Sequence, residues 1–198
     1  MRKEEERKRN NERSGSVSAK STTKKRTIIG IDPDSEKSGF SVFCPELKLY
    51  ANICSLSFPA LMKELQAWKR AAEYEDAELH VYIEGGWLNK SNWHLTTGKH
   101  TSLAKAAEIG RCTGRNHQTG ILIGEMCEAL GIAYTIIKPL KKMWRNKDGK
   151  ITAQEFKSVT GYTGRTNQDS RDAALIAWVC AGLPIRISSK KNIEYGKS

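Results

Sequence analysis

The chain of 198 residues lacks the features of membrane and secreted proteins. No apolar run reaches the roughly 20 residues that a membrane-spanning helix needs. The first residues, Met1 to Glu6, are mostly charged and include no apolar segment of the kind that secretory signals carry. The sequence therefore predicts a cytoplasmic protein that has no membrane partner.

Motifs for zinc, disulfides and nucleotides are also missing. The five cysteines include no Cys-x-x-Cys pair, are odd in number and stand mostly inside apolar segments, which is typical of reduced core residues in the cytosol. The four histidines show no pairing at metal-ligand spacing. No glycine-rich Walker loop is present, which excludes an ATPase of that class. We therefore expect no small-molecule cofactor.

What the chain has in excess is positive charge. Its formal net charge is +11 and its pI is about 9.5, which predicts a polyanionic partner such as nucleic acid. The alternative is that the basic residues serve solubility alone. Part of the charge also belongs to the N-terminal tail and therefore says less about the folded domain. Residues 1–26 mix charge with Ser, Asn and Gly and have no apolar periodicity, so we expect a disordered basic tail there. A second basic tail is expected at 186–198.

Between the tails, residues 27–185 are expected to form one domain of alternating elements. Strands are predicted at 27–32, 40–44, 47–54, 79–84 and 133–137. Helices are predicted at 58–74, about 102–130, 152–159 and 167–181. This order is that of the ribonuclease H-like fold, an α/β fold in which helices cover both faces of a mixed five-stranded sheet. Glycines between positions 110 and 124 weaken the long helix, so it either breaks there or admits a close neighbouring helix.

Four acidic residues stand where this fold would bring them together. Asp32 and Glu84 each end an apolar strand, and ligands gather at strand ends in open α/β sheets. Asp169 and Asp172 stand at positions i and i+3, so they share one face of the last helix. Each residue also has an ordinary interpretation as a turn former, a strand end or a helix cap. Their joint occurrence in this order is what indicates a site.

Clustered carboxylates need a counter-charge. Two of them repel by roughly 4 kcal/mol at 4 Å and an effective dielectric constant near 20, and hard divalent cations offset that repulsion. Oxygen donors suit Mg²⁺ or Mn²⁺ better than zinc, and a pair of such ions can clamp the attacking and leaving oxygens at phosphorus. The pattern predicts a metal-dependent phosphodiesterase that uses Mg²⁺, with Mn²⁺ able to replace it. The predicted catalytic and metal-binding residues are Asp32, Glu84, Asp169 and Asp172.

Three segments also resemble a known family. Ile28 to Ser35, followed by Gly39 to Val42, resembles the opening motif of the RuvC-like Holliday-junction resolvases. Tyr82-Ile83-Glu84 resembles their second acidic strand, and Gln168 to Ala177 is similar to their C-terminal acidic helix. The resemblance covers about residues 27 to 181. It implies a homodimeric endonuclease that cuts four-way DNA junctions and uses the same four acids as metal ligands.

The resemblance also implies which residues contact DNA. The family has an aromatic residue shortly after its second acid, and Trp87 stands there, where stacking on a base is worth about 1–3 kcal/mol. The alternative for Trp87 and Trp93 is burial beneath a loop. Family members also carry basic residues between the fifth strand and the acidic helix, and we expect these to contact phosphates. The predicted DNA-binding residues are Trp87, Lys90, Lys99, Lys138, Lys141, Lys142, Arg145 and Lys150, and Lys147 lies in the same basic segment.

The chain departs from the family at Asp34, where a glycine is usual. The added charge either weakens the approach of DNA or supplies a further metal ligand. Three other functions compete with the junction endonuclease. A non-catalytic DNA-binding relative would be favoured by the loss of an acid, and a ribonuclease acting on RNA/DNA hybrids is separated only by substrate tests. An actin-like ATPase shares the sheet and the first aspartate, but it needs a Gly- and Thr/Ser-rich phosphate loop where this chain has Asp34-Ser35-Glu36-Lys37.

Overall fold

The computed structural model describes residues 24–89, 102–141, 143–144, 146 and 149–185. Its strands are β1 (Arg26–Asp32), β2 (Ser38–Cys44), β3 (Leu49–Leu56), β4 (Glu78–Glu84) and β5 (Ala133–Ile137). Its helices are α2 (Phe58–Tyr74), the short 3₁₀ helix η1 (Gly86–Leu88), α4 (Leu103–Ala129), α5 (Ala153–Thr160) and α6 (Gln168–Cys180).

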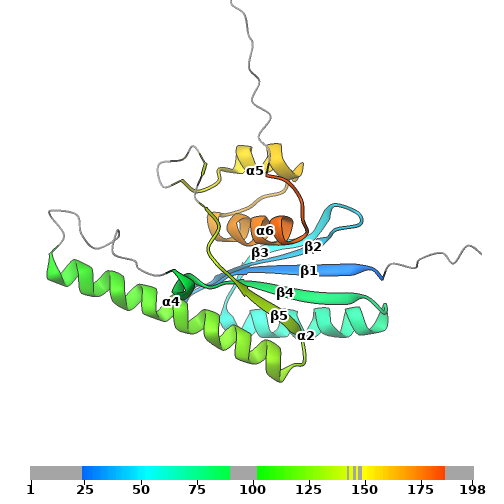
Figure 1. Ribbon diagram of the computed structural model, residues 1–198, viewed down its shortest axis with the longest axis horizontal. Helices are drawn as coiled ribbons and strands as arrows, with labels where there is room; N and C mark the ends of the chain where they lie inside the picture. Colours follow the sequence, from blue (N-terminus) through cyan, green and yellow to red (C-terminus); the bar gives the residue numbers. More distant parts are fainter. Residues whose placement is uncertain (1–23, 90–101, 142, 145, 147–148, 186–198) are drawn as a thin grey trace, which may run out of the picture.

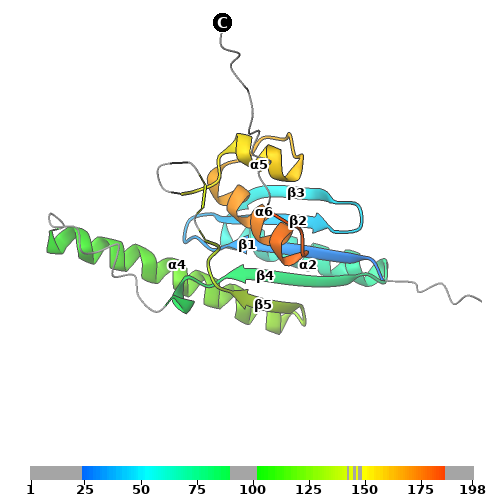
Figure 2. The same ribbon diagram turned by 45° about the horizontal axis from the view of Figure 1, so that its top comes forward.

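The strands form one mixed sheet in the order β3-β2-β1-β4-β5. β1 pairs antiparallel with β2, and β2 with β3, whereas the β1–β4 and β4–β5 pairs are parallel. α2 and α4 cover one face of the sheet, and α6, with α5 above it, covers the other (Figures 1 and 2). These are the strand order and helix layers of the ribonuclease H-like fold, so the predicted fold class is confirmed.

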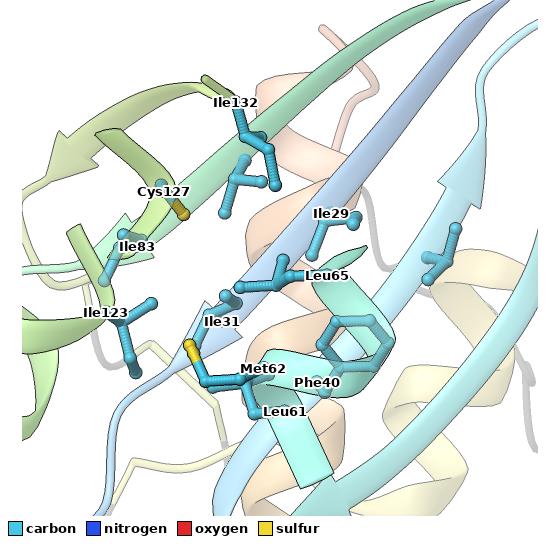
Figure 3. Close-up of a cluster of buried hydrophobic side chains, with 12 residues drawn as sticks. Ile29, Ile31, Phe40, Leu61, Met62, Leu65, Ile83, Ile123, Cys127 and Ile132 are labelled. Carbon is cyan, nitrogen blue, oxygen red and sulfur yellow. The ribbon is translucent and has the colours of Figure 1, made fainter. Parts of the chain in front are cut away.

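The sheet face beneath α2 and α4 carries the larger core. Successive side chains of a strand point to opposite faces, and alternate residues of β1 therefore point toward these helices. Ile29 and Ile31 join Leu61, Leu65 and Ile123 in one fully buried cluster (Figure 3). Burial of each such side chain is worth about 1.5–3 kcal/mol. This layer makes β1 a rigid central strand.

The opposite face holds α6 very close to the sheet because small residues line the contact. A Cβ atom at Gly30 would collide with the backbone of Ala173, and one at Gly39 would collide with the backbone of Asp169. The buried Ser41 hydroxyl donates a 2.9 Å hydrogen bond to the carbonyl oxygen of Ala173. α6 is therefore seated directly on β1 and β2.

The long helix is continuous as α4, so the first of the two alternatives, a break at the glycines, is wrong. The two glycines that contact the body of the protein, Gly120 and Gly124, lie against Trp87 and Tyr134. The close neighbours are therefore aromatic side chains rather than another helix. The N-terminal part of α4 extends beyond the sheet (Figure 1), and Leu103 at its start is 90% exposed.

The remaining elements begin and end within a few residues of the predicted positions. β1 begins at Arg26, inside the range predicted as the N-terminal tail, while residues 1–23 and 186–198 lie outside the described residues. α5 and α6 follow Thr152 and Asn167, whose side chains form capping boxes. The five cysteines are free; Cys127 is buried, and the other four are partly buried rather than in the core. None of the described helices is long and apolar enough to cross a membrane.

Candidate metal centre

Asp32 and Glu84 end two neighbouring parallel strands. Ile31 pairs with Ile83 in the β1–β4 ladder, so the two acids are the next residues on strands about 4.8 Å apart. The isoleucine side chains are buried on the α2 and α4 side, and the acids therefore point to the α6 side. A buried apolar residue before each acid holds its backbone in place.

The helix α6 brings a third acid to this point. Gly39 pairs with Asp32 across the β1–β2 ladder, and the backbone of Asp169 lies against Gly39. The first turn of α6 is therefore placed beside the end of β1. Asp172, further along this turn, lines the same cavity as Asp32 and Glu84. Two strand ends and one helix thus bring three of the four predicted acids together.

The cavity has a volume of about 170 Å³, and its other wall comes from the segment between β5 and α6. Two of the predicted phosphate-binding residues, Lys141 and Lys150, line this wall. Apolar side chains of Leu140, Trp144 and Ile151 complete it. A phosphate that approached the acids would therefore meet two ammonium groups beside them.

Two of the acids in this cavity, Asp32 and Asp172, have raised pKa values. Burial raises the pKa of the Asp32 carboxyl well above its usual range, and the negative charges of Glu84, Asp172 and Asp169 raise it further against the opposing charge of Lys150. Burial also raises the pKa of Asp172, again against the charge of Lys150. Acids with perturbed pKa values in a cavity are typical of functional sites.

Two side chains, Gln168 and Lys150, contact the carboxylate of Asp172. Gln168 Nε2 donates a 2.8 Å hydrogen bond to Asp172 Oδ1, and Lys150 Nζ lies 3.5 Å from Oδ2. In the part of the chain that the structure describes, no three His, Cys, Asp or Glu side chains are arranged to hold one ion. The carboxylate donors of Asp32, Glu84 and Asp172 nevertheless fit a hard divalent cation in their chemistry. Such a cation would compete with Lys150 for Asp172.

Asp169 faces a second groove, of about 500 Å³, which it lines together with Asp34 and Arg115. Its charge still raises the pKa of Asp32. The N-cap of α6 is Asn167, so the interpretation of Asp169 as the helix cap is wrong. Its role as a direct metal ligand stays a prediction.

Asp34, the departure from the resolvase motif, belongs to the turn after β1. Its Oδ1 accepts a 2.8 Å hydrogen bond from the backbone N–H of Glu36, and its Oδ2 accepts one of 3.0 Å from Asn116 Nδ2. Asp34 lines the second groove and not the cavity of Asp32. It therefore shapes the turn and adds no ligand to the cavity.

Trp87 lies on η1 and is partly buried against α4. Its ring meets that of His117 edge-on, with centroids 5.9 Å apart, and it covers Gly120. The alternative interpretation is burial beneath a loop, whereas the part of the ring that is buried packs against a helix. Stacking of Trp87 on a DNA base stays a prediction.

The other predicted DNA-binding residues are divided between described and undescribed parts of the chain. Lys138 is exposed just after β5, and Lys141 and Lys150 line the cavity. Four of the predicted DNA-binding residues lie outside the described ranges: Lys90, Lys99, Lys142 and Arg145. Trp93 and Lys147 also lie outside them.

Sequence reasoning missed Asn116, which contacts the turn that follows Asp32. Its partner Asp34 is 82 positions away along the chain. A single asparagine in the middle of a helix carries no local signal of such a contact, so only the tertiary structure reveals it.

No family model matches the sequence, and no curated protein matches it. Similar solved structures include T. thermophilus RuvC in complex with a Holliday junction substrate, with a TM-score of 0.43, 14% identity and coverage of 79% of this chain and 96% of that chain. A Thermus thermophilus RuvC structure is similar with a TM-score of 0.41, 15% identity and coverage of 79% and 97%. These similarities concern the fold, which the order and pairing of the strands establish independently.

Proposed function

We propose that this protein is a divalent-cation-dependent endodeoxyribonuclease that cuts four-way DNA junctions. The observation that carries the proposal is the convergence of Asp32, Glu84 and Asp172 in one cavity beside two lysines. Carboxylates gathered in this way repel one another unless cations offset their charge. The motif resemblance supports both the phosphodiesterase chemistry and the junction as substrate.

Each residue has a role that follows from its position. Asp32 and Glu84, on rigid strand ends, would hold the cation, and Asp172 on α6 would complete the donor set. When bound, Mg²⁺ or Mn²⁺ supplies positive charge at the scissile phosphate and activates water for attack. Lys141 and Lys150 would bind phosphate oxygens and orient the strand. Lys150, which contacts Asp172 in this structure, would be available to a phosphate oxygen when Asp172 serves as a metal ligand.

Affinity for DNA is expected to come from the basic segment between β5 and α5 rather than from the acids. Phosphate contacts supply most of the affinity of such proteins and make it dependent on salt. The net charge of +11 favours the same partner. Binding and cleavage should therefore be separable by mutation.

We also expect a homodimer, because the motif resemblance implies one and a four-way junction offers two equivalent strands to a two-fold symmetric enzyme. Sedimentation velocity of the purified protein, alone and with a junction, tests this expectation. A single monomeric species in both cases would contradict it.

The experiment that tests the proposal compares three labelled substrates. The purified protein is incubated with a four-way junction, a linear duplex and an RNA/DNA hybrid, each with Mg²⁺ and with EDTA. We expect paired cuts in the junction, only with Mg²⁺, and little cleavage of the other two. Preferential cutting of the hybrid would indicate a ribonuclease instead. Binding of the junction without any cleavage would indicate a non-catalytic relative.

A further inference from the structure

The turn that follows β1 is tied to the middle of α4. Asn116 donates from Nδ2 to Asp34 Oδ2 at 3.0 Å, and its Oδ1 accepts the backbone N–H of Ser35, also at 3.0 Å. Pro33, in the same turn, lies against Gly120, which is one helical turn beyond Asn116 on α4. A Cβ atom at Gly120 would come within 3.1 Å of the proline ring. Polar and apolar contacts together hold this turn on α4.

The segment that follows β4 rests on the same part of α4. Trp87 meets His117 edge-on, with ring centroids 5.9 Å apart, and a Cβ atom at Gly120 would come within 2.6 Å of the Trp87 ring. His117 in turn lies over Gly86, where a Cβ atom would come within 2.8 Å of its Nε2. The helical turn 116–120 is therefore the common support of both segments that leave the acid-bearing strands.

Asp32 and Glu84 are the last residues of their strands. The strand holds each acid from one side, and the segment after it constrains the acid from the other. We infer that the helical turn 116–120 of α4, here named the α4 support, sets the positions of Asp32 and Glu84 relative to each other, and that Asn116 is its positioning residue. The inference rests on the proposed function, because its consequence is the affinity of these acids for a divalent cation.

The pair formed by Asp34 and Asn116 allows a sharp test, because its two side chains can be exchanged without loss of a hydrogen bond. In the double variant Asp34→Asn/Asn116→Asp, the amide at position 34 still accepts the N–H of Glu36 and donates to position 116. The carboxylate at position 116 accepts that amide and the N–H of Ser35. Asp34→Asn alone sets two amides against each other, and Asn116→Asp alone sets two carboxylates against each other. Each single variant therefore loses at least one of these hydrogen bonds, and the double variant restores the full set.

The experiment measures Mn²⁺ binding by isothermal titration calorimetry for the full chain, both single variants and the double variant. Glu125→Gln, on the exposed side of the same helix but outside the turn 116–120, is the matched control. We expect each single variant to bind Mn²⁺ about tenfold more weakly, since residues that orient metal ligands typically contribute about 10- to 100-fold in affinity. The double variant and the control should stay within about twofold of the natural chain.

Hydrogen exchange in the metal-free proteins gives a second readout that does not depend on cation binding. We expect the backbone amides of residues 34–38 to exchange faster in both single variants and at the original rate in the double variant. If a single variant fails to fold, the double variant remains decisive, because the inference requires it to fold and to bind Mn²⁺ as the natural chain does.

The outcomes separate positioning from charge. If only the local charge mattered, Asp34→Asn would weaken Mn²⁺ binding and Asn116→Asp would strengthen it, and that opposite response would overturn the inference. Unchanged affinity in both single variants would also overturn it while leaving the proposed function intact. Absence of Mn²⁺ binding by the natural chain would instead refute the proposed function, and the inference with it.

Discussion

Two aspartates stand two residues apart in the chain and lie in opposite surroundings. Asp32 ends β1 in a cavity that it shares with Glu84 and Asp172, and burial together with those charges raises its pKa well above the usual range. Asp34 lies in the following turn, where its carboxylate accepts hydrogen bonds from the backbone and from Asn116. One carboxylate is held among like charges, and the other is matched by local donors.

This contrast separates a functional residue from a structural one of the same type. A buried carboxylate among like charges lowers stability, and natural proteins retain such arrangements chiefly where activity requires them. A carboxylate that accepts backbone and side-chain hydrogen bonds stabilises its own turn. Asp32 is therefore the candidate for chemistry and Asp34 the candidate for architecture. Substitutions at the two positions should differ in size in their effect on cleavage and in sign in their effect on stability.

The largest expected difference is in cleavage. Asp32→Asn should lower the single-turnover rate on a four-way junction by about 10³-fold or more, which corresponds to about 4 kcal/mol of barrier, because it removes a ligand of the proposed centre. Asp34→Asn should lower the rate by about tenfold at most when Mg²⁺ is saturating, since it affects cation affinity through the turn. Junction affinity of the Asp32→Asn protein, measured in EDTA, should stay within about threefold of the natural chain.

Two results would break this part of the comparison. Cleavage by the Asp32→Asn protein at the natural rate would show that the metal assignment is wrong. Equal losses of cleavage and of junction binding would place Asp32 in DNA binding rather than in chemistry.

The features that could be predicted from the sequence are those encoded by local patterns. The helix Phe58–Tyr74 has apolar residues at helical spacing along its whole length, and its predicted and observed ends coincide. The proximity of Asp32 and Glu84 follows from strand ends that any sheet of this order places side by side, and Asp172 joins them from α6. Pattern and topology therefore suffice for the fold and for the main acids.

The features that could not be predicted depend on how particular side chains meet across the fold. Asn116 contacts Asp34 only because one turn of α4 lies beside the β1–β2 turn. Asp169 shares a helix face with Asp172 but lines a different groove, since a shared face does not settle the direction of each side chain. The packing of Trp87 on Gly120 likewise depends on the path of the chain after β4. No local periodicity records such contacts.

The next effect in size is the response to Mg²⁺. At low salt and at 100 times its dissociation constant, a ligand that binds only the folded state stabilises it by about 2.7 kcal/mol, which corresponds to roughly 5–10 °C in a domain of this size. We expect such a shift in Tm for the natural chain and a much smaller one for Asp32→Asn. Absence of any shift in a thermal scan of the natural chain would contradict a site assembled before DNA binds.

A smaller effect is expected on stability in EDTA, with opposite signs at the two positions. Asp34→Ala should lower Tm by a few degrees, because it removes hydrogen bonds worth about 1 kcal/mol. Asp32→Asn should raise Tm, because it removes a carboxylate that burial and neighbouring charges disfavour. A fall in Tm for both variants would erase the proposed distinction between the two aspartates.

The pH dependence of Tm in EDTA tests independently the sign of the effect expected for Asp32→Asn. The folded-state pKa of Asp32 is raised, so its contribution to stability is fully present below the unfolded pKa near 3.9 and is lost as pH rises through the folded value. The Tm advantage of Asp32→Asn over the natural chain should therefore be absent at acid pH, grow as pH rises, and level off above the folded pKa.

The smallest effect is expected at Lys150, the cation that lies 3.5 Å from Asp172 in this structure. Lys150→Met should lower Tm in EDTA by only about 1–3 °C, because a partly exposed ion pair is worth no more than about 1 kcal/mol. It should also enlarge the Mg²⁺-induced shift in Tm, since the divalent cation no longer displaces an ammonium group. Lys63→Met, on the exposed side of α2 and across the sheet from the cavity, removes the same charge and should leave that shift unchanged. Equal shifts in the two variants would mean that Lys150 and the divalent cation do not compete for Asp172.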